Sequence, residues 1–112
     1  MKGIIVTVEG EVKEIEFNNV DALEVFQGAV KGYIEYVRFP ILNMCMIVNE
    51  EGLIYDLPNN LLGTYCYRTF KERGTSIRGD VLFIGYGDGK GNDTGLNEAQ
   101  IQMLKGIESK II

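Results

Sequence analysis

Histidine is absent from this chain of 112 residues, and cysteine occurs only twice, at Cys45 and Cys66. Without histidine, the chain cannot form a Ser-His-Asp or Cys-His catalytic group, a histidine-ligated zinc or iron site, or an imidazole pH switch. Two thiols cannot complete a four-thiolate metal site, and they do not form a disulfide framework in a chain of this length. Both stand among apolar or aromatic residues, so we expect two buried thiols without nucleophilic reactivity.

Basic residues are outnumbered, with 11 Lys and Arg against 16 Asp and Glu, for a formal net charge of -5. Because affinity for duplex nucleic acid depends on neutralising phosphates, this balance argues against direct nucleic-acid binding. Long hydrophobic runs are also missing. The run Ile4-Ile5-Val6 is too short for a signal peptide, and no stretch approaches the length of a membrane span. We therefore expect a cytoplasmic protein that does not contact a membrane.

Hydrophobic residues make up 46% of the chain, and neither repeats nor proline-rich linkers divide it. We expect a single domain over residues 1–112. Alternating apolar residues over 4–17 predict a hairpin, and helical spacing over 20–30 predicts a helix. Short apolar runs at 33–39, 44–48, 53–55 and 81–84 predict further strands, of which the run at 44–48 is typical of a strand buried on both faces.

The C-terminal helix has the clearest start, because Asn97 and Gln100 have the spacing of a capping box. Together these elements predict an α+β fold: a mixed, mostly antiparallel sheet of about five or six strands with two helices on one face. The other face would then be left for a partner. Exposed strand edges and abundant tyrosine also favour a homodimer or small homo-oligomer, with the ligand site near the subunit boundary.

The glycine-rich segment 85–95 invites comparison with nucleotide and calcium loops. No register gives GxGxxG or a P-loop. An EF-hand beginning at Asp88 would place Lys90 at a ligand position and Ala99 where a glutamate is required. We interpret the segment as a polar connection between a strand and a helix, or as a mobile lid over a ligand. The paired carboxylates Glu50-Glu51 are interpreted as a solvated turn.

Charge is unevenly distributed along the chain. The N-terminal part carries most of the acids in one cluster, consisting of Glu9, Glu11, Glu14, Glu16, Asp21 and Glu24. Residues 65–78 are instead basic and aromatic. Guanidinium groups beside tyrosines suit a nucleotide or another phosphorylated ligand, because the former bind phosphate oxygens and the latter stack on a base. The alternative is a solvated connection whose aromatic residues belong to the core.

The order of several short motifs along the chain resembles one family. The motifs are a GYIEYV strand in 32–37, the turn Asn49-Glu50-Glu51-Gly52, Leu57-Pro58-Asn59-Asn60, a glycine-flanked strand over 79–85 and the helix start at 96–101. Their order is similar to that of a small phage and mobile-element family named domain of unknown function 3846.

Two positions depart from the family pattern. Leu61 stands where members often have arginine, so a contact made by that arginine cannot be carried over. Asn97 replaces the usual Ser or Thr and keeps the helix cap. Asn49 and Asn60 match the family motifs and are therefore candidates for a binding site, although both can instead cap turns.

The resemblance implies an accessory gene of a phage or mobile element, and small proteins of that kind commonly interfere with host machinery. We expect no enzyme activity, no cofactor and no metal. The first hypothesis is a counter-defence protein in the host cytoplasm that sequesters a small phosphorylated, nucleotide-like ligand. The candidate ligand-binding residues are Asn49, Asn60, Tyr65, Tyr67, Arg68, Arg73 and Arg78. The alternative is an inhibitor whose acidic cluster binds a basic host protein, either a nucleic-acid-binding or a defence protein.

Overall fold

Five strands form one sheet among the residues that the computed structural model describes, which are 1–52, 54–71 and 76–111. The strands are β1 (Lys2–Val6), β2 (Val12–Glu16), β3 (Ile34–Phe39), β4 (Met44–Asn49) and β5 (Val81–Gly85). Their order across the sheet is β2-β1-β5-β4-β3, and every neighbouring pair is antiparallel. The predicted α+β class and strand number are confirmed.

The prediction of a mixed sheet is wrong for these strands. β4 and β5 are neighbours that run in opposite directions, so the long segment between them returns to the same end of the sheet. A parallel pair would have needed a crossover to the opposite end. The predicted strand over 53–55 is also wrong where the structure describes it, because Ile54 and Tyr55 lie in a turn; Leu53 lies outside the described residues.

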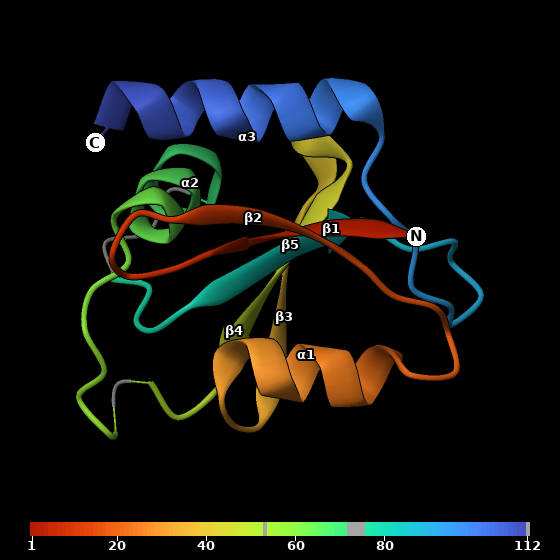
Figure 1. Ribbon diagram of the computed structural model, residues 1–112, viewed down its shortest axis with the longest axis horizontal. Coiled ribbons are helices and arrows are strands. Elements are labelled where there is room, and N and C mark those ends of the chain that lie inside the picture. The colour runs from red at the N-terminus through yellow and green to blue at the C-terminus, as the bar shows by residue number, and fades with distance from the viewer. Residues whose placement is uncertain (53, 72–75, 112) are drawn as a thin grey trace.

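Helices cover both faces of the sheet (Figure 1). Helix α1 (Ala22–Val30) lies on one face, whereas α2 (Leu61–Lys71) and α3 (Glu98–Ile111) lie on the other. The prediction of two helices on a single face is therefore wrong, and so is the expectation of a free sheet face. Along the described chain, none of the helices is both long and apolar enough to cross a membrane.

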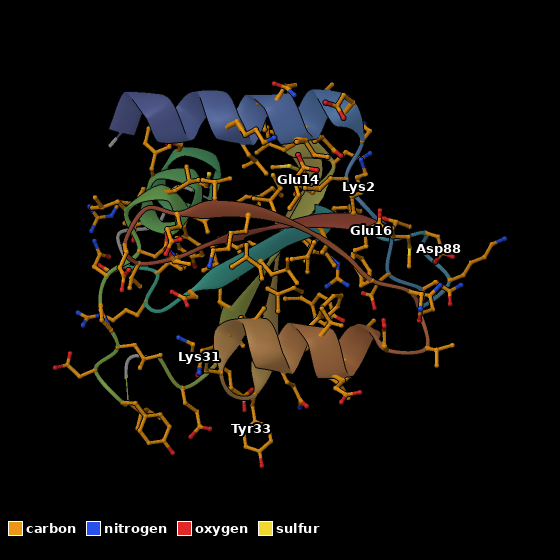
Figure 2. The ribbon with its side chains drawn as sticks, in the orientation of Figure 1. Lys2, Glu14, Glu16, Lys31, Tyr33 and Asp88 are labelled. Carbon is orange, nitrogen blue, oxygen red and sulfur yellow. The ribbon has the colours of Figure 1, made fainter. Side chains whose placement is uncertain are left out.

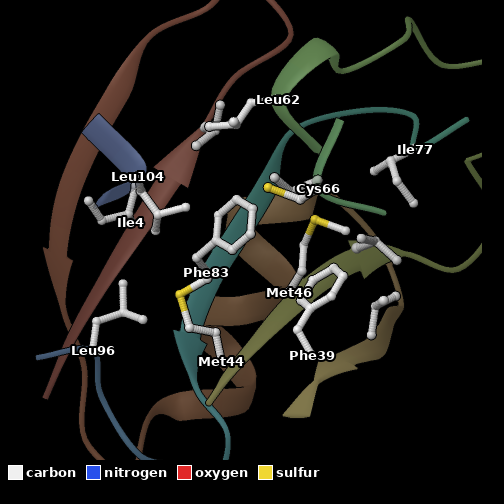
Figure 3. Packing of buried hydrophobic residues seen from close by; sticks show 14 of the residues in the cluster. Ile4, Phe39, Met44, Met46, Leu62, Cys66, Ile77, Phe83, Leu96 and Leu104 are labelled. Atoms are coloured by element: carbon white, nitrogen blue, oxygen red, sulfur yellow. The ribbon is translucent and has the colours of Figure 1, made fainter. Parts of the chain in front are cut away.

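Two apolar layers explain why both faces are covered. Between the sheet and α2 and α3, residues such as Met46, Leu62 and Phe83 are almost completely buried (Figure 3). On the other face, Phe26 of α1 is buried against the sheet and makes edge-to-face contacts with Phe17 and Tyr36, at centroid distances of 5.2 and 6.4 Å. Central strands with apolar residues on both sides need a layer of helices on each.

Local hydrogen bonds fix where the helices begin and end. The predicted capping box is confirmed: the Gln100 N–H donates to Asn97 Oδ1 at 2.8 Å, and the Asn97 N–H donates to Gln100 Oε1 at 2.9 Å. The Gln100 amide also donates to the carbonyl of Asn43 at 2.9 Å, which ties α3 to the connection between β3 and β4. Helix α1 ends at Val30 and is capped by Lys31, whose φ of 62° is left-handed, while the Gly32 N–H donates to the carbonyl of Gln27.

Candidate functional site

Asn60 is a structural anchor in this fold. Its side chain is fully buried. Its Nδ2 donates to the carbonyls of Val6 and Gly79, both at 2.9 Å, and its Oδ1 accepts the N–H of Gly63 at 2.9 Å. This side chain joins β1, the start of α2 and the segment before β5, so it is not available to a ligand. We therefore remove Asn60 from the candidate site and assign it the helix-capping role.

Asn49, the other asparagine of the family motifs, joins three segments at the end of β4. Its Nδ2 donates to the carbonyl of Val30 at 3.1 Å, and its Oδ1 accepts the N–H of Glu51 at 2.8 Å. Gly32 approaches so closely that a Cβ there would lie 2.6 Å from Asn49 Nδ2. Asn49 remains partly exposed and lines a surface cavity on each side.

The structure divides the predicted basic and aromatic site. Tyr65 and Arg68 lie on the exposed side of α2, whereas Tyr67 and Arg78 line a cavity with Asn49. Arg78 already binds Asp56, with Nη1 2.8 Å from the carboxylate oxygen. The cavity has a volume of about 130 Å³, which is below the range of roughly 300–1,000 Å³ that small-molecule sites usually occupy. Arg73 lies outside the described residues.

A cavity of about 420 Å³ lies on the α1 face of the sheet, and we call it the glycine-loop cavity. Side chains from β3, β4 and β5 and the loop over 86–93 line it. Its lining includes Tyr36, Arg38, Cys45, Gly87, Gly89, Gly91 and Asp93. Asp88 lies at the outer end of this loop (Figure 2). The volume falls within the small-molecule range.

Hydrogen bonds hold the glycine loop in place. At its base, the Gly85 N–H donates to the carbonyl of Thr94 at 2.9 Å, and the Gly87 N–H donates to Thr94 Oγ1 at 3.1 Å. At its tip, Asp88 Oδ1 accepts the N–H groups of Lys90 and Asn92. Gly87, Gly89 and Gly91 all have positive φ, which favours glycine. That the loop acts as a mobile lid over a ligand remains a prediction.

The comparisons with known proteins agree with the motif order. The family described as domain of unknown function 3846 (DUF3846) matches residues 1–108. The chain belongs to the DUF3846 family. Neither the curated proteins nor the solved structures gave a match. In this DUF3846 chain, the Asn49-Glu50-Glu51-Gly52 motif begins at the last residue of β4 and forms the turn that follows, and Asn60 caps the start of α2.

The charges in the glycine-loop cavity of the DUF3846 chain are closely placed. The Tyr36 hydroxyl donates to Asp93 Oδ1 at 3.1 Å, and the Arg38 guanidinium lies 5.0 Å from the centre of the Tyr36 ring. Burial, together with the Asp93 carboxylate, raises the pKa of Tyr36 to about 12. Tyr36 therefore stays a neutral phenol at physiological pH. The cavity thus combines one cation, one anion and a neutral hydroxyl.

Cys45 forms part of the cavity wall but is almost completely buried. Burial raises the pKa of the Cys45 thiol to about 12, with Arg38 opposing the shift and Asp93 adding to it. Burial also raises the pKa of Cys66 to about 12. Both thiols are buried as the sequence predicts, and neither is a thiolate at neutral pH. The part of the chain that the structure describes contains no group of three or more His, Cys, Asp or Glu side chains that could hold a metal.

The buried thiols predict a loss of stability in alkaline solution. In the unfolded chain they ionise near pH 8.5, whereas in the folded chain they remain protonated until about pH 12. A pKa that is raised by folding gives stability that is present at low pH and lost as the pH rises. The free energy of unfolding, measured with urea, should be about 1.5 kcal/mol lower at pH 9 than at pH 7. The double variant Cys45→Ala, Cys66→Ala should lack this pH dependence; an equal loss in that variant would contradict the assignment.

Sequence reasoning missed Tyr36, Arg38 and Asp93. The sequence signal that could have led to this site was the glycine-rich loop directly after a buried strand. The alternation of β3 also predicts that Tyr36 and Arg38 share one face of the sheet. It does not predict that this face meets the loop over 86–93, because that depends on the order of strands.

Proposed function

We propose that this chain is an accessory protein of a phage or mobile element that sequesters a small phosphorylated, nucleotide-like ligand as a counter-defence activity. The ligand binds in the glycine-loop cavity. The observation that carries the proposal is that Arg38, Tyr36 and the glycine loop line one cavity of about 420 Å³. The family resemblance supports the phage or mobile-element origin, and the ligand chemistry is inferred from the lining residues.

The phosphate is assigned to the Arg38 side of the cavity. A guanidinium presents planar, paired donors that match phosphate oxygens, and it stays charged at every physiological pH. Gly87, Gly89 and Gly91 add no side chains to the opposite wall, so a ligand can approach the backbone closely. These two features favour an anionic group held between β3 and the loop.

The other end of the ligand is assigned to Tyr36 and Asp93. One oxygen of the Asp93 carboxylate accepts the Tyr36 hydroxyl, and a carboxylate can accept further hydrogen bonds from an amino group of a base. The same carboxylate repels a second phosphate placed beside it. The site therefore favours a ligand with a phosphate at one end and an amino-bearing ring at the other.

Ligand binding should appear as thermal stabilisation. Linear and cyclic nucleotides are added at about a hundred times the dissociation constant, which adds about 2.7 kcal/mol and raises Tm by roughly 10–20 °C for a domain of this size. Arg38→Gln should remove the shift. Arg68→Gln, on the exposed side of α2, is the matched control and should keep it. If none of the compounds raises Tm, the proposal is contradicted. If the rise in Tm is lost only in Arg68→Gln, the site lies on α2 instead.

A second candidate function is an inhibitor of a basic host protein. It is favoured by the position of β2 at the edge of the sheet, where Glu14 and Glu16 are exposed (Figure 2). Glu11, directly before β2, is exposed as well. Phe17 and Met1 exchange backbone hydrogen bonds, and hydrogen-bonded pairs alternate with non-hydrogen-bonded pairs along two antiparallel strands. The backbone N–H and C=O groups of Glu14 and Glu16 therefore point away from β1. Capture of a stoichiometric partner from host lysate that is released by high salt would support this candidate over ligand sequestration.

A further inference from the structure

A second large cavity lies at the opposite end of β3 from Arg38, and we call it the tyrosine cavity. It has a volume of about 570 Å³ and is lined by residues of the α1 terminus, the start of β3 and the turn after β4. Tyr33 and Tyr55 both line it, although the two residues are 64% and 65% exposed. Tyr33 points away from the body of the molecule (Figure 2). Two largely exposed aromatic rings at one concavity are typical of an interaction site.

The backbone holds both tyrosines in place. The Glu50 N–H donates to the carbonyl of Tyr33 at 3.0 Å, and the Tyr55 N–H donates to the carbonyl of Glu51 at 3.0 Å. Asn49 binds the N–H of Glu51 and the carbonyl of Val30, so it connects the turn to the end of α1. The backbone segments that carry the two tyrosines are therefore positioned by the fold before any partner arrives.

The charges around the tyrosine cavity favour a cation. Glu51 places a carboxylate in its lining, and the C-terminal end of α1 contributes the negative end of the helix dipole. The faces of tyrosine rings also attract cations. Lys31 lines the cavity as well, but its Nζ lies 3.3 Å from Asp80 Oδ2, which offsets its charge.

We infer that the tyrosine cavity is a docking site for an arginine side chain of a partner protein. A guanidinium is planar, stacks on tyrosine and binds a carboxylate through two donors, so Tyr33, Tyr55 and Glu51 match its chemistry. Leu57 adds an apolar surface to the same lining, which suits the methylene groups of the side chain. None of the residues in this assignment lines the glycine-loop cavity, so this docking site and the proposed ligand site can be tested separately.

The test is an NMR titration of the folded protein that follows the ring resonances of Tyr33 and Tyr55. The probe is N-acetylarginine amide, and the matched control is N-acetylcitrulline amide, which has nearly the same shape without the charge. Arginine should give saturable shifts of both rings, with a dissociation constant on the order of millimolar. Citrulline should bind at least about tenfold more weakly. Equal responses to the two probes, or no saturable response to arginine, would overturn the inference.

Variants separate the roles of the rings from their effect on folding. Tyr33→Ala and Tyr55→Ala should each weaken arginine binding about fivefold, whereas Tyr33→Phe and Tyr55→Phe keep the ring face and should bind within about twofold of the natural protein. Glu51→Gln keeps its backbone hydrogen bonds and should weaken binding by removing the carboxylate. The amide spectrum reports folding in every case. Binding that is unchanged in both alanine variants, or equally strong for N-acetyllysine amide, would overturn the arginine assignment.

Discussion

Replacing Asn60 with alanine is expected to lower the free energy of unfolding by about 3–5 kcal/mol. The substitution leaves the carbonyls of Val6 and Gly79 and the N–H of Gly63 without their partner in a fully buried position. Each buried polar group without a partner costs roughly 1–3 kcal/mol. Since small domains are stable by only about 5–15 kcal/mol, urea or thermal unfolding should show a large shift of the midpoint.

Two further variants make the Asn60 prediction specific. Asn19→Ala changes an exposed asparagine and should alter stability by less than about 0.5 kcal/mol. Asn60→Asp places a carboxylate oxygen against two carbonyl oxygens, which should raise the pKa of the new carboxyl group in the folded state. Stability of that variant is therefore retained at low pH and lost as the pH rises. Two results would show that Asn60 is not an anchor: a loss of stability in Asn60→Asp that does not depend on pH, or an unchanged free energy of unfolding in Asn60→Ala.

Gly85→Ala should lower the free energy of unfolding by about 3 kcal/mol and open the base of the glycine loop. A Cβ at this position would collide with Thr94 Oγ1 and lie 2.6 Å from the carbonyl oxygen of Gly95. Backbone atoms cannot rotate aside, so the loop has to move away from β5. Urea unfolding measures the loss, and faster hydrogen exchange at the Gly85 amide, which donates to Thr94, reports the opening.

The matched control for the glycine loop is Gly28→Ala. Gly28 lies in α1, and a Cβ there would meet nothing within 4 Å. Alanine is the better helix former, so this variant should gain about 0.5–1 kcal/mol. Unchanged hydrogen exchange at the loop in Gly85→Ala would contradict the close packing of β5 against Thr94 and Gly95. A ligand-binding defect in Gly85→Ala without one in Gly28→Ala would connect the loop to the glycine-loop cavity.

Much of the sheet could be predicted from the sequence because its signals are local. The strand at 44–48 was predicted to be buried on both faces, and Met46 and Ile47 are indeed fully buried on opposite faces. That pattern already requires helices on both faces of the sheet. However, the sequence of an amphipathic helix does not indicate which face of the sheet the helix covers, so the two predicted helices could not be assigned to faces. Helix α2 has no clear signal in the sequence, because Gly63 and Thr64 are weak helix formers and Asn60 favours either a turn or a cap.

The site was harder to predict because residues distant in sequence form it. Tyr36 and Asp93 meet only after β3, β4 and β5 have become neighbours. The family motifs, in turn, led to Asn49 and Asn60, whose side chains bond to the chain itself. A polar residue within a motif can therefore belong to the architecture, and its burial is needed to distinguish that role from binding.

The strand order also has a consequence for synthesis on the ribosome. The β1–β2 and β3–β4 hairpins are each local in sequence, but they become one sheet only through β5, which pairs with β1 on one side and β4 on the other. Because β5 ends at Gly85, every residue up to that point has to leave the ribosomal tunnel before the central strand can insert. The nascent chain therefore exposes two unfinished hairpins until β5 has emerged, a stage at which chaperones are expected to act.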